Sequence, residues 1–506
     1  MLCAMMCKQC EGGRILAARI RVVTAVAVAW GLLGCRVEPT MPGPIEIRPD
    51  GGSVITSYDV KRDRHPDYWR YQGPDGRIRS VAFGAASSPH EPGERVDLDA
   101  IRATGCPHFV IALDGVPFEL VEQMYREGHF RLFHPPSRVI ACFPSLTDLG
   151  LAELFHAGRC IANQALYYDR KANRLSDGNA VYLSGKNAPW VRKMTYRCSF
   201  WWDGLSYLDP QTVFDHEMIG IVDAFRRVRT GEAYTYSIGS AGLGIRWGRP
   251  GFIDFLLTVD RLCEQIVYEN RGRAKITLTS DHGHGLVECT PISFEKVLTA
   301  GGYRLRNSIR DPKDVVAVAY GLCTYAELST KDPTGVAGCL LNHPGVDLVT
   351  YAAGDCVIVR DRNGEARVRK GAAGFVYEAQ RGDPLKLAGI LERLRRDGKV
   401  TASGEADPQA LFAATVDHDY PDPLRRVWEA FHDIVDNPPD LIVSLRDDAC
   451  YGSRFFYAMI GKVGSTHGSL NRRNSTTVAM TMLGDLPPVM RARDVMPELE
   501  KLRTSR

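Results

Sequence analysis

The stretch AKITLTSDHGHG, residues 274–285, decides the fold that we expect for this chain. Its first part is a short apolar run with β-branched residues, which indicates a buried strand. The run ends in Asp281, His282 and His284, which are spaced by glycines. Packing alone does not require a carboxylate and two imidazoles at the end of a buried strand. This strand end is therefore a candidate metal site.

Other apolar runs along the chain end in a similar way. HFVIAL (108–113) is followed by Asp114, and SRVIACF (137–143) leads into a turn, PSLT, that carries Thr147. Two further runs near the end of the chain also have the composition of strands: DLIVSL (440–445) and STTVAMTML (475–483). Helical patterns lie between the strands, so the chain is predicted to be α/β, with helices on both faces of a mostly parallel sheet. Ligands of such sheets gather at the carboxyl ends of the strands.

The segment between residues 291 and 420 interrupts this alternation. It contains CVIVRDRNGEARVRK (356–370), a predicted hairpin in which Asn363 and Gly364 would supply the positive φ values of a tight turn. We expect this segment to be an insertion or cap. The predicted division of the chain is an export signal (1–34), a tether and N-terminal extension (35–100), a core (101–290 and 421–490) and the insertion (291–420).

The N-terminus has the pattern of an export signal. Basic residues precede an apolar stretch, residues 22–33, which ends in GLLGC at Cys35. This ending resembles the bacterial lipobox, in which the cysteine is lipidated. The resemblance implies a membrane anchor at Cys35 and a location at the bacterial cell envelope, facing the periplasm or the exterior. An ordinary signal in which Cys35 is incidental is the alternative.

The charge balance is even, with 63 basic and 60 acidic residues, so composition gives no nucleic-acid-binding signature. The strand ends suggest a different chemistry. Carboxylate and imidazole together suit Zn²⁺, and a hydroxyl bound to such an ion has a lowered pKa and becomes a nucleophile. A hydroxyl at a helix N-terminus also lies among free backbone amides that bind phosphate. The residues therefore suggest metal-assisted attack on a phosphoryl group.

The order of these motifs resembles a known family. VIALDGV, FPSLT, SDHGHG and STHGSLNRRNSTTVAMTM follow one another as in the alkaline phosphatase superfamily, in its nucleotide pyrophosphatase/phosphodiesterase-like branch, over roughly residues 105–485. The resemblance implies a three-layer alkaline-phosphatase-like core and hydrolysis of a small-molecule phosphate mono- or diester through Thr147. It assigns one ion, by default Zn²⁺, to Asp114, Thr147, Asp281 and His282, a second ion to His467, and phosphate binding to Asn163.

The chain departs from the family at the second ion. The segment YSIGSAGLGIRWG (236–248) has Ala241 where the family has an aspartate and Ile245 where it has a histidine. Neither side chain can bind a metal. The resemblance thus leaves open a pseudoenzyme of the same fold with a binding role at the envelope.

A sulfatase is a further alternative, because CFPSL resembles the sulfatase C-x-P-S-R motif. Leu146 stands in place of its arginine, and the spacing to Gly158 favours Thr147 over Cys142 as nucleophile.

Overall fold

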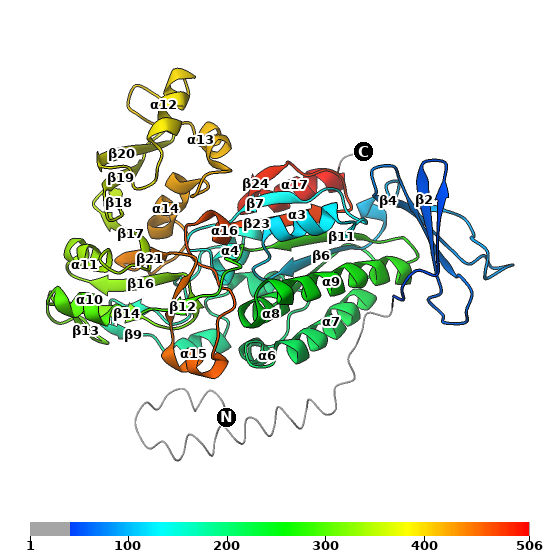
Figure 1. The fold of residues 1–506 in the computed structure, drawn as a ribbon, viewed down its shortest axis with the longest axis horizontal. Coiled ribbons are helices and arrows are strands. Elements are labelled where there is room, and N and C mark those ends of the chain that lie inside the picture. Colours follow the sequence, from blue (N-terminus) through cyan, green and yellow to red (C-terminus); the bar gives the residue numbers. More distant parts are fainter. Residues whose placement is uncertain (1–40, 505–506) are drawn as a thin grey trace, which may run out of the picture.

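The computed structural model describes residues 41–504. Cys35 and the predicted export signal lie outside the described residues. The chain folds around two sheets, and a smaller sheet lies at one end (Figure 1). None of the helices between residues 41 and 504 is both long enough and apolar enough to cross a bilayer.

The central sheet has six strands in the order β10-β6-β11-β23-β7-β24. Their bounds are β6 (His108–Leu113), β7 (Ser137–Ile140), β10 (Glu232–Ser237), β11 (Lys275–Ser280), β23 (Thr476–Thr481) and β24 (Val489–Arg491). β23 is antiparallel to both neighbours, and the other pairs are parallel. The predicted mostly parallel α/β sheet is confirmed.

Helices cover both faces of this sheet. The side chains of β6 alternate, so that Phe109 and Ile111 pack into one apolar cluster and Val110 and Ala112 into another. The first cluster includes α3 (Phe118–Arg126), α7 (Pro210–Arg227) and α9 (Arg249–Glu269), and the second includes α4 (Thr147–Leu154) and α17 (Ala492–Thr504). Complete burial of a Phe, Ile or Val side chain, as in Phe109, Ile111 and Val110, stabilises the fold by about 1.5–3 kcal/mol. A strand buried on both faces explains the continuous apolar run HFVIAL.

Strand register places the candidate residues side by side. Leu113, at the end of β6, pairs with Ser237 of β10 on one side and with Ser280 of β11 on the other. The next residues, Asp114 and Asp281, therefore leave the sheet at the same edge.

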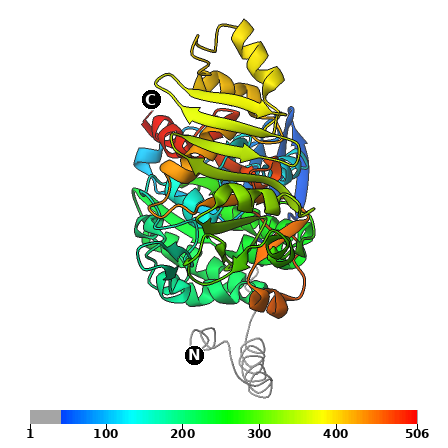
Figure 2. The same ribbon diagram turned by 90° about the vertical axis from the view of Figure 1, so that its left-hand side faces the viewer.

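The second sheet has eight strands in the order β13-β14-β16-β21-β17-β18-β19-β20, and it is antiparallel except for the β13–β14 pair. Figure 2 shows it facing the viewer. Its strands are β13 (Arg304–Leu305), β14 (Asp314–Val318), β16 (Tyr325–Thr330), β17 (Val346–Ala353), β18 (Cys356–Arg360), β19 (Glu365–Lys370), β20 (Phe375–Arg381) and β21 (Leu441–Leu445). Most come from the segment 291–420. β21 lies within the predicted core segment 421–490, but it is an interior strand of this second sheet.

The predicted hairpin forms between β18 and β19, but its turn differs from the expected one. Neither Asn363 nor Gly364 has a positive φ. Instead the Asp361 carboxylate accepts hydrogen bonds from the backbone N–H groups of Asn363 (2.8 Å) and Gly364 (2.5 Å). The four-residue connection 361–364 is long enough to close without left-handed residues, so the positive-φ prediction was wrong.

Residues 46–97 form a third, antiparallel sheet of five strands, which the sequence analysis did not anticipate. Its strands are β1 (Glu46–Asp50), β2 (Ser53–Tyr58), β3 (Tyr68–Gln72), β4 (Ile78–Phe83) and β5 (Val96–Asp97). The remaining elements are η1 (Ala103–Gly105), β8 (Tyr168–Asp169), β9 (Arg174–Leu175), α5 (Gly178–Leu183), η2 (Pro189–Lys193), α6 (Phe200–Leu205), α8 (Gly239–Trp247), β12 (Thr290–Pro291), α10 (Glu295–Ala300), β15 (Leu322–Cys323), α11 (Pro333–Leu340), α12 (Ala388–Arg396), α13 (Pro408–Thr415), α14 (Pro423–His432), β22 (Ala449–Gly452), α15 (Arg454–Ile460) and α16 (Arg472–Ser475).

Candidate active site

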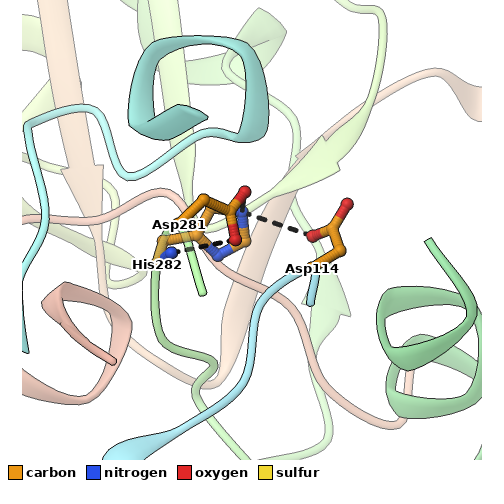
Figure 3. A group of neighbouring side chains, drawn as sticks. All are labelled: Asp114, Asp281 and His282. Atoms are coloured by element: carbon orange, nitrogen blue, oxygen red, sulfur yellow. Dashed lines mark hydrogen bonds and ion pairs between the residues drawn. The ribbon is translucent and has the colours of Figure 1, made fainter. Parts of the chain in front are cut away.

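Three of the predicted metal ligands come together at the carboxyl edge of the central sheet. Asp114 follows β6, and Asp281 and His282 follow β11 (Figure 3). His282 Nε2 lies 3.3 Å from Asp281 Oδ2 and 3.6 Å from Asp114 Oδ1. All three side chains are buried, and their ligand atoms lie within 4.8 Å of one another.

Thr147 lies beside these three side chains, and it belongs to α4, in the helix layer that also includes α17. It is the first residue of α4, and its Oγ1 lies 3.3 Å from His282 Nε2 and 3.3 Å from Asp114 Oδ2. Gly150, one turn further along, allows this close approach, because an added Cβ would lie 2.7 Å from the Asp281 carbonyl oxygen. The predicted nucleophile therefore lies at the helix N-terminus and beside the predicted metal ligands.

The two oxygens of Asp281 have different surroundings. Oδ1 accepts hydrogen bonds from the backbone N–H groups of Gly115 (2.9 Å) and His282 (3.0 Å). Oδ2 is buried and has no hydrogen-bond partner. A buried carboxylate oxygen without a partner is rare, since it loses its hydration without compensation. Oδ2 is therefore suited to bind a cation.

Burial sets the protonation of the group. It raises the pKa of Asp281 to about 7, and burial together with the neighbouring Asp281 raises the pKa of Asp114 well above its ordinary value. Burial lowers the pKa of His282 to about 4. His282 Nδ1 lies 2.9 Å from the Gly283 carbonyl, which can only accept, so Nδ1 donates and Nε2 keeps its lone pair. Two carboxylates, an imidazole lone pair and a hydroxyl are a donor set that fits a divalent cation.

Tyr236 supports Asp114 from the neighbouring strand. Its hydroxyl donates a hydrogen bond to Asp114 Oδ2. Tyr236 pairs with Ala112 in the β10–β6 register, two residues before Asp114. The sequence alone does not reveal this role of Tyr236, because the role depends on which strand lies beside β6.

Two further histidines lie beside the group without joining it. His467 is buried, its ring stacks on that of His282 at a centroid distance of 3.9 Å, and its Nδ1 donates to the Ser145 carbonyl at 2.9 Å. His284 is bonded through Nδ1 to the Ser465 hydroxyl, and its buried Nε2 has no partner. The assignment of His467 to a metal thus stays a prediction.

Asn163 is occupied by a different contact. Its Nδ2 donates to Glu327 Oε2 at 2.9 Å, and its Oδ1 is buried without a partner. Glu327 also accepts from the Tyr325 hydroxyl at 3.0 Å, and burial raises its pKa to about 7. No hydrogen bond among residues 41–504 joins Asn163 to Asp114 or Thr147, so its role in phosphate binding stays a prediction.

The expected second-ion positions lie on α8 and face apolar surroundings. Ala241 packs in the cluster of Val110 and Ala112, and Ile245 in a different cluster with Cys289 and Val463. At the start of α8, the buried Glu217 carboxylate accepts hydrogen bonds from the backbone N–H groups of residues 238 and 239. Positions 241 and 245 therefore contribute to apolar packing and provide no metal ligand.

Cys142, the sulfatase alternative, is buried and belongs to an apolar cluster with Phe143 and Leu146. Burial raises the pKa of its thiol. Its Sγ contacts the Pro144 carbonyl at 3.5 Å. The geometry thus favours Thr147 over Cys142 as the nucleophile, because Thr147 lies beside the predicted metal ligands.

Comparisons with known proteins give structural neighbours. No protein-family model matches the chain, and no curated protein sequence matches it. Similar solved structures include human ectonucleotide pyrophosphatase/phosphodiesterase 5 (11% identity, TM-score 0.40) and the phosphonoacetate hydrolase of Sinorhizobium meliloti 1021 in complex with phosphonoformate (13% identity, TM-score 0.42). Each match covers 79% of this chain and 95% of the other.

At these TM-scores the likeness carries no argument about the chemistry, which rests on the residues of this chain.

Proposed function

We propose that this chain is a metal-dependent hydrolase of small-molecule phosphate esters, with Thr147 as its nucleophile. The observation that carries the proposal is the unpartnered Asp281 Oδ2, 3.3 Å from the lone pair of His282 Nε2. Asp114, Asp281 and His282 would hold one divalent cation, by default Zn²⁺, and Thr147 would be a fourth ligand. When bound, such an ion lowers the pKa of a hydroxyl and neutralises charge on phosphoryl oxygens.

The residues suggest two chemical steps. In the first, Thr147 Oγ1 forms a bond to phosphorus while the bond from phosphorus to the departing alcohol oxygen breaks. The threonine proton passes to Asp114, its hydrogen-bond acceptor at 3.3 Å, and the alcohol takes a proton from solvent. In the second, water attacks the phosphothreonine, one water proton restores the Thr147 hydroxyl, Asp114 returns its proton to solvent, and the phosphate product leaves. The sum is one ester bond hydrolysed for one water consumed.

A catalytically inactive binding protein of the same fold is the second candidate. The apolar packing of Ala241 and Ile245 favours it, because a second cation that would stabilise the leaving group has no ligands there. Loss of one such electrostatic contact lowers the rate by about 100- to 1,000-fold. We therefore expect a slow enzyme.

Substituting Thr147 separates the two candidates. We expect Thr147→Ala to lower kcat for a model phosphodiester at least roughly a thousandfold, because the nucleophile is gone. Thr147→Ser is the matched control, since it keeps the hydroxyl, and it should retain measurable hydrolysis. Steady-state kinetics with and without a chelator provide the measurement. Equal rates for the wild type and Thr147→Ala would exclude the proposed nucleophile.

We also propose that the chain is anchored by a lipid on Cys35 and acts at the bacterial cell envelope. The lipobox-like GLLGC ending supports this location.

The ten cysteines of the described part of the chain are free thiols, and all but Cys339 are buried.

A further inference from the structure

Arg426, on α14, is the largest side chain buried completely in the described structure. Burial and the neighbouring Arg425 lower its pKa to about 10, which leaves the guanidinium charged at neutral pH. Within residues 41–504 it forms no ion pair with a carboxylate. Burying a cation without such a partner is unfavourable, so stability alone does not account for this arginine.

The guanidinium instead joins three segments of the chain. Nη2 donates to the Cys142 carbonyl (3.1 Å), the Ser145 hydroxyl (3.2 Å) and the Ser475 hydroxyl (2.6 Å), and Nη1 donates to the Pro421 (3.0 Å) and Leu470 (3.2 Å) carbonyls. Every acceptor is neutral. Two of them, Cys142 and Ser145, belong to the turn that immediately precedes Thr147.

The same turn is held from its other side. His467 Nδ1 donates to the Ser145 carbonyl at 2.9 Å, and the Ser145 N–H donates to the Gly468 carbonyl at 3.2 Å. The Ser145 hydroxyl also donates to the Cys142 carbonyl at 3.0 Å. Ser145 is fully buried and lies two residues before Thr147. The position of Thr147 is thus determined by a turn whose polar atoms are fixed by Arg426 and His467.

We propose that Arg426 is a positioning residue: it fixes the turn 142–146 so that Thr147 Oγ1 lies against Asp114 and His282. This inference rests on the proposed function. Only the planar guanidinium of an arginine has several donors in fixed directions. One of its nitrogens bonds to Cys142, Ser145 and Ser475, while the other bonds to the Pro421 and Leu470 carbonyls. A lysine offers three donors from a single point and cannot hold both segments.

Arg426→Lys tests the proposal, with Arg425→Lys as its matched control. Arg425 is the adjacent buried arginine. It pairs with Asp422, with Glu429 and with Glu153 in the last turn of α4, and it forms no hydrogen bond with the turn. We expect Arg426→Lys to lower kcat roughly 100-fold, since a misplacement of about 1 Å has this effect, with KM within about threefold. Zn²⁺ affinity should also stay within about threefold, because Asp114, Asp281 and His282 form no hydrogen bond with Arg426. Arg425→Lys should lower the urea midpoint without changing kcat.

Ser145→Ala provides a second variant in case Arg426→Lys does not fold. It removes one acceptor of the guanidinium and should lower kcat about tenfold, with no further loss in the double variant if both act through one contact. A folded Arg426→Lys with kcat within about twofold of the wild type, or an unaffected Ser145→Ala where Arg426→Lys is unfolded, would overturn the inference. If Thr147→Ala is nevertheless inactive, the proposed function stands. A wild-type chain without Thr147-dependent hydrolysis overturns both.

Discussion

The two carboxylate oxygens of Asp281 have different roles: one binds the backbone and the other faces the candidate site. Oδ1 is held by two backbone N–H groups, which fixes the side chain, and Oδ2 is left facing His282 Nε2 without a donor. Such an arrangement is costly in the metal-free protein and favourable once a cation is bound. The raised pKa of Asp281, about 7, expresses the same cost.

The pKa of Asp281 predicts how Zn²⁺ affinity depends on pH. Below about pH 7 its carboxyl is protonated in the metal-free protein, so the ion must displace a proton. We expect the affinity to fall roughly tenfold for each pH unit between about pH 7 and about pH 5.5, and more steeply where Asp114 also holds a proton. Titration calorimetry at several pH values measures this slope.

Asp281→Asn is the control for this dependence. It keeps the size of the side chain but carries no titrating carboxyl, so it should bind Zn²⁺ weakly and lose this part of the slope. A wild-type affinity that stays constant over the whole range would contradict the assignment.

The residues that the sequence could not reveal are those that lie in no motif and at no strand end. Asp114, Asp281, His282 and Thr147 follow strands in a recognisable order, so their convergence could be predicted. Arg426 gave no signal, because the carbonyls that it binds are defined only by the folded turn.

The helix α8 carries buried apolar side chains at the two positions where the family that the motifs resemble has metal ligands. Ala241 and Ile245 are buried in two different apolar clusters, and the Glu217 carboxylate occupies the helix N-terminus. The helix is thus built as part of the core.

Restoring the expected ligands in α8 should therefore fail. We expect the double variant Ala241→Asp, Ile245→His to bind no second ion and to lose about 2–5 kcal/mol of unfolding free energy, because it buries polar groups without partners. Urea unfolding and elemental analysis measure the two quantities. Ile245→Val is the control, with an expected loss of about 0.5–1.5 kcal/mol. A gain of one ion at unchanged stability would show that α8 is a dormant metal site.

Local patterns identified the strands of the core but not every strand's sheet. The continuous apolar run of β21 is buried on both faces, and this pattern fits either sheet. Its neighbours, β16 and β17, lie about a hundred residues earlier in the sequence, and no local signal records such a pairing. The segment 35–100, predicted as a tether and N-terminal extension, contains five strands between residues 46 and 97.

At the scale of the whole molecule, the site lies where the two large sheets meet. The segment that carries His467 continues into β23 of the central sheet. It also bonds to the second sheet, since the Leu470 N–H donates to the Ser444 hydroxyl of β21 and the Ser469 N–H donates to the Thr324 hydroxyl beside β16. The segment 291–420 thus helps to fix the wall of the site.

The predicted anchor is tested on the full chain. We expect the wild type to fractionate with bacterial membranes and Cys35→Ser to lose its lipid, because no other residue in GLLGC carries a thiol. Detergent phase partition and the intact mass measure the change. A wild-type protein without a lipid would contradict the anchor and leave the hydrolase proposal unaffected.

The central claim is that one cation, bound beside Thr147, makes the chain a phosphate ester hydrolase. It is tested most directly by titrating chelator-treated protein with Zn²⁺ while phosphodiester hydrolysis is followed. We expect the rate to rise linearly and to level off at one ion per chain, and Thr147→Ala to bind the ion without gaining activity. A rate that is independent of the ion, or a break at two ions per chain, would contradict the account.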